Sequence, residues 1–451
     1  MLKFAPVNFK GDLFATGFSF GAQAVIKLVS SMILTRILRP EAYGIITILL
    51  SIVFVVELLA DMNVTLFIIR EHNAEEPRFL NTAWTIRLAR ATINAAIVFL
   101  GAPLIATTFY HAPELILPLR VFSFSFLIGG MESMTFPLAL RRKQARVVMY
   151  SELLAALLST TFSVIYCRFS RDYWGLIYGI LLNRLLITVF SYRFFPELRP
   201  RFFFDLAAAR EIMKFTKFTM PSSLLTIAMT QFDKVVFLRL FDLRLLGIYG
   251  LAGNIAAPIE SLVAKISNQV LYPRCAHNFR TDRSTSPLKY YTENVRLFAS
   301  ILFVPAAIGG AARLVIALLY DPRYSQAADV LQAFMLRAML LSLSTPAEDL
   351  MIAAGVSHVM LVGNLFRALW MFVMSLSGYY FFGFMGFTYG AALSPLPPLI
   401  YYWSLQRKSG MMVAKYEFMK ISFAASAAIA AFVGSSLLLA IWPAARISIR
   451  H

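Results

Sequence analysis

Charged residues stand inside stretches of sequence that are otherwise apolar, and these residues are the best placed to do chemistry. Lys27 lies midway along the first apolar stretch, and Gln23 lies one helical turn before it on the same face. Later stretches contain four more cations: Arg184, Lys265, Arg337 and Arg367. A charge within a membrane helix is costly, so it usually faces a water-filled cavity or an opposite charge. The cations therefore predict either an anion-binding cavity or ion pairs that hold helices together.

Carboxylates form a second group within the apolar stretches. They are Glu57, Asp61, Glu132, Glu152, Asp233, Glu260, Glu348 and Asp349. A carboxylate in such a setting can carry a proton or ligate sodium, and so couple transport to an ion gradient. We expect Asp61, Asp233 and Glu57 to be the candidates for this coupling. The alternative is that the acids only form hydrogen bonds and ion pairs between helices.

Patterns for catalysis or for binding a cofactor do not occur in the sequence. The five histidines are scattered and none has the spacing of a metal site. No glycine-rich loop ends in Lys followed by Ser or Thr, so ATP hydrolysis is not expected. Cys167 and Cys275 are predicted at opposite membrane faces, which excludes a disulfide between them. We therefore predict a chain that is not an enzyme and that holds no cofactor or metal.

Composition places these residues in a membrane protein. Of the 451 residues, 59% are apolar and 15% are charged, whereas about a quarter of a soluble domain is charged. The net charge of +18 comes mainly from cations in short segments between apolar stretches. That distribution is typical of cytoplasmic loops, and a nucleic-acid partner would require one continuous basic face. We predict an inner-membrane protein with its N-terminus, including Lys3 and Lys10, in the cytoplasm.

The apolar stretches predict an all-α bundle of thirteen membrane-spanning helices, since each is long enough to cross about 30 Å of hydrocarbon. The predicted spans are 12–36, 43–69, 82–109, 115–138, 147–167, 173–195, 212–238, 245–272, 294–319, 326–353, 357–381, 384–404 and 419–442. We expect a six-helix N-terminal lobe in residues 1–205 and a six-helix C-terminal lobe in 206–405. Residues 406–451 then form an extension with one further span.

An internal repeat relates the two predicted lobes. Residues 34–44 and 238–250 both have an apolar-Arg-apolar helix end, a tight turn, and then Tyr with Gly opening the next helix. Each segment is the first outer hairpin of its lobe, so the repeats run in the same direction. Parallel repeats with a site between the halves are a transporter architecture.

Helix-breaking and small residues predict local features of the spans. Pro258, Pro346 and the prolines of 395–398 mark places where helices can bend. The GxxxG motifs at 17–21 and 386–390 predict close packing of helices within one chain.

Three segments resemble those of a known family. They are SSMILTRILRPEAYGIITILLSIVFVVELLADMNV at 30–64, KFTMPSSLLTIAMTQFDKVVFLRLFDLRLLGIYGLAGNI at 217–255, and SNQVLYPRCAHN at 267–278. They resemble the polysaccharide transporter family, the Wzx-type oligosaccharide flippases of the multidrug/oligosaccharidyl-lipid/polysaccharide exporter superfamily. The resemblance implies two helical lobes that form a V and open alternately to either side. The sequence departs from the family in one respect. Family members have twelve or fourteen spans, whereas this sequence has one span after the twelfth and therefore thirteen.

The resemblance also implies a substrate and a site. The substrate would be an undecaprenyl-diphosphate-linked oligosaccharide used for exopolysaccharide or O-antigen assembly. In such flippases, cations on the first and eighth helices hold the head group, and Lys27 and Lys265 match by helix. Arg337 or Arg367 would assist, and Arg184 and Gln23 are further candidates. Expected partners are membrane lipids and the polymerase and export machinery of polysaccharide assembly.

Two other classes compete with a flippase. A cation-coupled multidrug exporter shares the architecture, but it would favour an acidic, apolar cavity over one with several cations. A membrane polymerase or ligase needs an extended outer loop with catalytic residues, and no such loop is present in the sequence.

Overall fold

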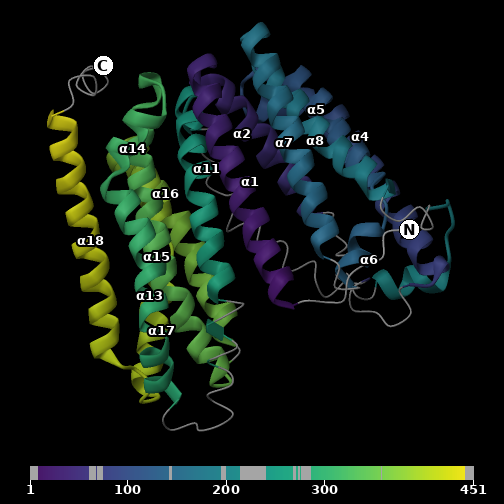
Figure 1. Ribbon diagram of the computed structural model, residues 1–451. Coiled ribbons are helices and arrows are strands. Elements are labelled where there is room, and N and C mark those ends of the chain that lie inside the picture. The colour runs from purple at the N-terminus through teal and green to yellow at the C-terminus, as the bar shows by residue number, and fades with distance from the viewer. Residues whose placement is uncertain are drawn as a thin grey trace. The chain divides into compact units, whose positions relative to one another are not determined.

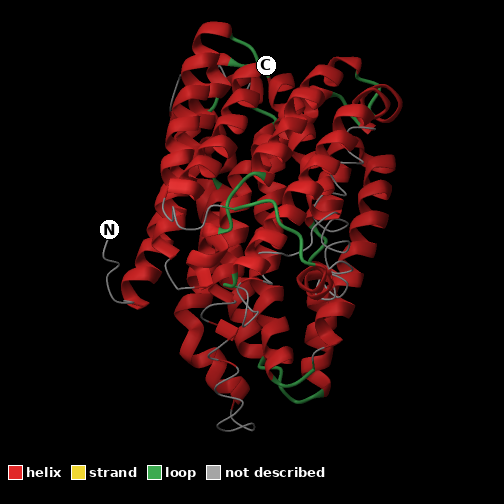
Figure 2. Ribbon diagram, turned by 90° about the vertical axis from the view of Figure 1, so that its right-hand side faces the viewer, coloured by secondary structure: helices red, strands yellow, loops and turns green. Residues whose placement is uncertain are grey.

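The computed structural model describes residues 9–59, 68, 75–141, 145–193, 200–213, 240–267, 271–272, 275, 286–356 and 358–441. The regular structure in these residues is helical, and they include no strand (Figure 2). Because lipid cannot hydrogen-bond to backbone groups, apolar stretches of this length must form helices. The structure confirms the predicted all-α class.

The chain folds into two compact units. Unit 1 comprises Met1–Ile227 with Leu238–Leu240, and unit 2 comprises Ala228–Phe237 with Phe241–His451. The predicted division into 1–205, 206–405 and 406–451 stays a prediction.

Unit 1 is a bundle of long helices (Figure 1). Its described helices are α1 (Phe9–Ile37), α2 (Pro40–Leu59), α4 (Pro77–Leu104) with a π-helical turn at Ile105–Phe109, α5 (Ile116–Gly130), α6 (Thr135–Arg141), α7 (Ala145–Ser170) and α8 (Trp174–Arg193). Pro40 and Pro77 open their helices, where a missing N–H breaks no intrahelical bond. α4 packs along α5, α7 along α8, and α1 along α7.

Unit 2 contains the other helices. They are α11 (Leu243–Ile266), α13 (Ser286–Gly310), α14 (Ala312–Leu319), α15 (Ala327–Ala353), α16 (His358–Ala392), α17 (Leu396–Lys408) and α18 (Ala414–Ile441). The Asp242 carboxylate caps α11 by accepting from the Leu245 N–H at 2.8 Å. α15 packs against α11, α13, α16 and α17, so it forms the centre of the unit.

Most of the predicted spans are helices in the structure. Within the described residues, nine helices are long and apolar enough to cross a membrane, or ten if the bent pair α13 and α14 forms one span. α1 is not among the nine, although it covers the predicted span 12–36. The predicted span 212–238 lies almost wholly outside the described residues.

Two predicted spans are interrupted in the structure. Over 115–138, α5 ends at Gly130 and α6 begins only at Thr135. Over 294–319, α13 and α14 are bent by 66° on either side of Ala311. Each break follows a pair of adjacent glycines, 129–130 and 309–310. Glycine is a poor helix former, so a Gly-Gly pair lets the helix stop where packing favours a turn.

The eleventh and twelfth predicted spans form a tight hairpin. Gly383 has φ 62° and ψ −140°, which interrupts α16 between the two predicted spans. The backbones of Gly378 and Gly386 lie so close that a Cβ on either would clash with the other, and Gly390 lies equally close to Met374. The structure thus confirms close packing at the 386–390 motif. At the 17–21 motif the prediction is wrong for Gly21, because a Cβ there would have no neighbour within 4 Å.

The last helix, α18, packs along α13. The Ser435 hydroxyl donates to the Gly310 carbonyl at 3.3 Å, and the rings of Phe303 and Phe423 lie 6.4 Å apart. A Cβ on Gly310 would clash with the backbone of α18. The thirteenth predicted span is therefore a helix, α18, which packs against α13 in unit 2.

Candidate functional site

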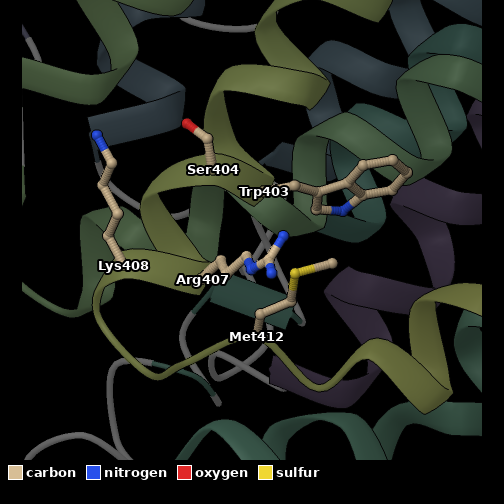
Figure 3. A pocket seen from close by; sticks show the side chains of 5 residues that line it. All are labelled: Trp403, Ser404, Arg407, Lys408 and Met412. Atoms are coloured by element: carbon tan, nitrogen blue, oxygen red, sulfur yellow. The ribbon is translucent and has the colours of Figure 1, made fainter.

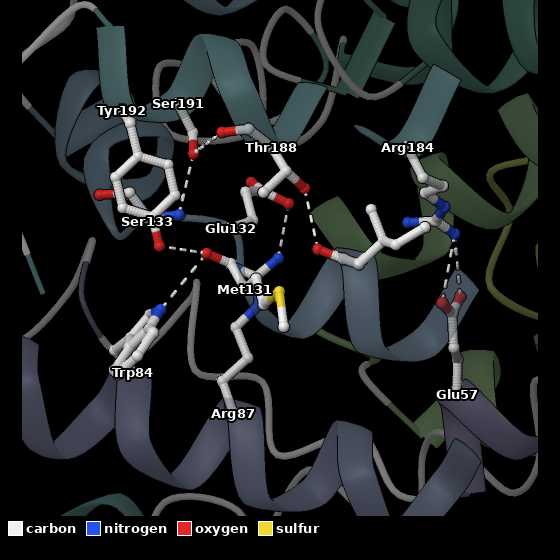
Figure 4. Close-up of polar contacts among 11 residues, drawn as sticks. Glu57, Trp84, Arg87, Met131, Glu132, Ser133, Arg184, Thr188, Ser191 and Tyr192 are labelled. Carbon is white, nitrogen blue, oxygen red and sulfur yellow. Dashed lines mark hydrogen bonds and ion pairs between the residues drawn. The ribbon is translucent and has the colours of Figure 1, made fainter. Parts of the chain in front are cut away.

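Polar side chains of α4 and α8 meet the end of α5 (Figure 4). Tyr192 Oη and Trp84 Nε1 both donate to the carbonyl of Met131. Thr188 Oγ1 donates to the carbonyl of Ile128 at 2.9 Å. The last carbonyls of a helix lack intrahelical donors, and lipid supplies none. These three side chains therefore make a helix end possible inside the bundle.

An ion pair stabilises the same place, residues 131–134, which we call the α5 break. Arg87 Nη2 on α4 lies 2.6 Å from Glu132 Oε2, and the side chains are only 19% and 14% exposed. The Ser133 N–H donates to Ser191 Oγ of α8 at 2.9 Å. The α5 break is thus an irregular segment whose polar groups are bonded from both neighbouring helices.

A second ion pair of unit 1 joins two of the predicted site residues. Arg184 Nη2 on α8 lies 3.2 Å from Glu57 Oε1 on α2. Both side chains are more than one third exposed, at 39% and 37%. An ion pair with this exposure contributes less to stability than an enclosed one, so its partners can be exchanged at lower cost.

Lys27 has a different setting. It lies on α1 with an exposed side chain, and it makes no ion pair with any carboxylate in the described part of the chain. It stands ten residues before the end of α1 at Ile37, which is about 15 Å along the helix axis and about half of a hydrocarbon core. Gln23 is half-buried and donates to Ser19 Oγ at 3.4 Å, and Ser19 in turn reaches the Met149 carbonyl of α7.

In unit 2, Arg337 of α15 has a carboxylate partner. Its Nε lies 2.8 Å from Glu260 Oε1 of α11, and the two side chains are 20% and 21% exposed. The guanidinium also lies over the ring of Phe334, 4.6 Å from its centroid. Both contacts favour the cation and fix its direction.

Two adjacent acids of α15 point to different partners. Asp349 is buried and accepts a short hydrogen bond from the Ser267 hydroxyl. Glu348 interacts electrostatically with Tyr402 and with Arg367 of α16. Arg367 therefore lies within electrostatic range of an acid, whereas Arg337 forms a direct ion pair.

Close packing holds this cluster in place. Tyr402 of α17 is 2% exposed, and its hydroxyl lies where a side chain on Gly363 of α16 would be. One turn later, Gln406 Nε2 donates to the Ala347 carbonyl at 2.9 Å. The polar groups of α15, α16 and α17 are thus interlocked.

The remaining predicted residues are less informative. Lys265 is half-buried in the last turn of α11 and has an interaction partner. Asp61 and Asp233, two of the three predicted coupling residues, lie outside the described residues.

Sequence reasoning missed several residues that shape these clusters. Arg87 stands within an apolar helix, but other polar residues surround it in the sequence. The sequence alone therefore does not set it apart as a site residue. Trp84, Tyr192 and Tyr402 carry no signal as polar residues, since aromatic side chains are common in any membrane helix. The sequence signal that could have pointed to these residues is the Gly129–Gly130 pair. It marks the end of a helix, where the last carbonyls need hydrogen-bond donors from other helices.

The arrangement can bind and exchange charged groups. No group of three or more His, Cys, Asp or Glu side chains suited to a metal ion occurs in the described residues. Among the predicted cations, Arg184 and Arg337 are paired with a carboxylate and Lys27 is exposed, and a positive charge inside an apolar bundle favours a negatively charged partner.

Comparison with known proteins places this arrangement in a family. Residues 33–329 match the model of a family described as polysaccharide biosynthesis protein. The chain is 22% identical over 373 residues to the lipopolysaccharide biosynthesis protein WzxC of Escherichia coli K12, covering 81% of this chain and 74% of WzxC. It is 24% identical over 294 residues to the succinoglycan biosynthesis transport protein ExoT of Rhizobium meliloti 1021, covering 64% of this chain and 59% of ExoT.

Solved structures show the same fold at low sequence identity. The lipid II flippase MurJ in an inward closed conformation superposes with a TM-score of 0.69 at 11% identity, over 97% of this chain and 95% of MurJ. An inward-facing multidrug MATE transporter of the MOP superfamily superposes with a TM-score of 0.63 at 15% identity, over 87% of this chain and 94% of that one. The chain shares the fold of MurJ and of this MATE transporter, and because the family model matches well over half of its residues, it belongs to the polysaccharide biosynthesis protein family.

Proposed function

We propose that the chain is a flippase that carries undecaprenyl-diphosphate-linked oligosaccharide units across the bacterial inner membrane. The units would serve exopolysaccharide or O-antigen assembly, and the polymerase and export machinery of that assembly would receive them. The N-terminus would lie in the cytoplasm. The family, and the biosynthetic roles in the names of WzxC and ExoT, support this choice of substrate class.

The physical task explains which residues matter. A flippase must move a diphosphate and several sugars through a region that excludes charge, while the lipid tail stays in hydrocarbon. The anion therefore needs a cation at mid-depth that is not already neutralised. A cation with a carboxylate partner contributes less, because the substrate must first displace that partner.

The observation that carries the proposal is the state of Lys27. Its side chain is exposed ten residues before the end of α1, and it has no carboxylate partner in the described part of the chain. An ammonium group facing hydrocarbon there would be costly, so it faces a water-filled path. We assign Lys27 to the diphosphate, with Gln23 beside it on the same helix face.

The other predicted cations then take secondary roles. Arg184 and Arg337 bind Glu57 and Glu260, so their charges are available only when those pairs open. Arg367 lies next to Glu348. Lys265 remains the second candidate for the head group, in the other unit.

The Arg184–Glu57 pair provides a route for ion coupling. When a proton or a sodium ion takes Glu57, Arg184 is released and can bind an anion instead. Asp61 and Asp233 are further candidates for the same role. Proton coupling predicts that an uncoupler stops translocation, and unchanged translocation would exclude it.

The decisive experiment is depletion of the protein in cells. Spheroplasts are then labelled with a membrane-impermeant glycan probe, and lipid-linked oligosaccharide is quantified on each membrane face. Complete units that accumulate on the cytoplasmic face, with loss of polymer, support flipping. Units that reach the outer face without polymerising would favour a polymerase, and no change at all would favour a drug exporter.

Variants of Lys27 test the site itself. Lys27→Gln should reduce export about tenfold or more, because a charge-assisted contact is worth roughly 1.5–3 kcal/mol. Lys27→Arg should retain most of it. Arg168→Gln, which removes an exposed cation at the end of α7, is the matched control. Normal export by Lys27→Gln at equal protein level would contradict the assignment.

A further inference from the structure

A pocket opens at the end of α17, where the chain turns toward α18 (Figure 3). It has a volume of about 480 Å³ and is lined by Trp403, Ser404, Arg407, Lys408 and Met412. The turn is completed by Gly410, whose φ of 67° suits glycine. None of these residues belongs to the site described above.

The pocket has an excess of positive charge. Arg407 and Lys408 are exposed, and neither pairs with a carboxylate in the described residues. The nearest acid along the chain, Glu417, is buried and holds Lys420 Nζ at 2.8 Å. The charges of Glu417 and Lys420 therefore cancel each other, and Lys415 adds another exposed cation near the turn.

Trp403 gives the pocket a hydrogen-bond donor with no acceptor. Its Nε1 is shielded from solvent and has no partner among the described residues. Figure 3 shows the indole nitrogen on the side of the ring that faces Arg407. A buried N–H without an acceptor is costly, and an oxygen atom of a ligand would satisfy it.

The position of the pocket indicates the kind of ligand. The turn joins two membrane-spanning helices, and Phe418 next to it is 73% exposed. Tryptophan and cations at such a turn are typical of the membrane–water interface, where they meet lipid head groups. Met412 supplies an apolar wall that suits the glycerol end of a lipid.

We propose that this pocket binds the phosphodiester head group of an anionic glycerophospholipid. Arg407 and Lys408 bind the phosphate, and Trp403 Nε1 donates to one of its oxygens. The bound lipid fastens the α17–α18 turn to the cytoplasmic membrane surface. This role does not depend on which molecule the chain transports.

Tryptophan quenching by brominated lipid tests the proposal. The purified full chain is placed in mixed micelles of phosphatidylcholine, and brominated phosphatidylglycerol is titrated in. The chain has five tryptophans, so the signal of Trp403 is the difference between the wild type and Trp403→Phe. We expect saturable quenching of Trp403 that brominated phosphatidylcholine does not reproduce.

Charge variants provide the second part of the test. Arg407→Gln with Lys408→Gln should weaken the apparent affinity about 30-fold, since each cation near a membrane surface is worth about 1 kcal/mol. Arg168→Gln should leave it unchanged, and an unaltered thermal unfolding midpoint confirms folding of each variant. Equal quenching by both brominated lipids would overturn the proposal. Displacement of the lipid by submillimolar inorganic pyrophosphate would overturn it too, in favour of a soluble phosphate ligand.

Discussion

Ion pairs between helices differ in how open they are: Arg184–Glu57 of unit 1 is partly open, whereas Arg337–Glu260 of unit 2 is enclosed, as Arg87–Glu132 of unit 1 also is. The Arg184–Glu57 pair of unit 1 is 39% and 37% exposed, and Lys27 is exposed without a carboxylate partner in the described residues. The Arg337–Glu260 pair of unit 2 is about half as exposed, at 20% and 21%. Asp349 of the same unit is 6% exposed.

Open and enclosed ion pairs suit different roles in the same fold. Open pairs can exchange partners with water, ions or substrate, so they suit a transport cycle. Enclosed pairs are bonded to neighbours on several helices and lose much when one partner is removed. We therefore expect substrate and coupling chemistry to depend more on Lys27 and the open Arg184–Glu57 pair, and the stability of the bundle to depend more on enclosed pairs such as Arg337–Glu260.

The largest expected effect comes from breaking the enclosed pair. Arg337→Gln leaves the Glu260 carboxylate without its partner and should lower the free energy of unfolding by about 3 kcal/mol. Adding Glu260→Gln removes the stranded charge and should restore part of the loss. Steric trapping in bicelles measures both. A loss below about 1 kcal/mol in the single variant would remove the distinction between open and enclosed pairs.

Overpacking unit 2 should have a somewhat smaller effect. A methyl group on Gly363 would overlap the Tyr402 hydroxyl, so Gly363→Ala must displace α17 or its tyrosine. We expect a loss of about 2 kcal/mol, typical of overpacked cores. Gly434→Ala on α18, where a Cβ has no neighbour within 4 Å, is the control and should cost nothing measurable.

The α5 break tests whether unit 1 contains a rigid part of its own. Tyr192→Phe removes one of the two donors to the Met131 carbonyl and leaves Trp84 in place. Hydrogen bonds between membrane helices are worth about 0.6 kcal/mol on average, so we expect a loss of about 1 kcal/mol at most. Tyr380→Phe, at a side chain 82% exposed, is the matched control.

The smallest stability effect is expected at the open pair. Arg184→Gln should change the free energy of unfolding by less than about 0.5 kcal/mol, because exposed pairs contribute little. Its export activity should nevertheless fall, since the variant cannot exchange Glu57 for an anion. A stability loss equal to that of Arg337→Gln would show that the open pair and the enclosed pair contribute equally to the stability of the bundle.

Much of the fold followed from local sequence. A helix satisfies its own backbone hydrogen bonds, and lipid offers no alternative, so an apolar stretch such as 326–353 determines α15 almost alone. The hairpin at Gly383 was predictable for the same reason, because glycine tolerates the required φ and small residues flank it. The choice of charged candidates also came from sequence, since charges in apolar stretches are rare.

Only the tertiary structure decided which charges meet. Arg184 and Glu57 are 127 positions apart, and Arg337 and Glu260 are 77 apart, so no local pattern could pair them. The end of α5 at Gly130 depends on donors from α4 and α8, and the bend after Gly310 accompanies close contact with α18. Composition and periodicity thus determined the helices of this protein, because helix formation in lipid is local. Packing between distant helices determined which of its charges are open and which are enclosed, because pairing and burial are not local.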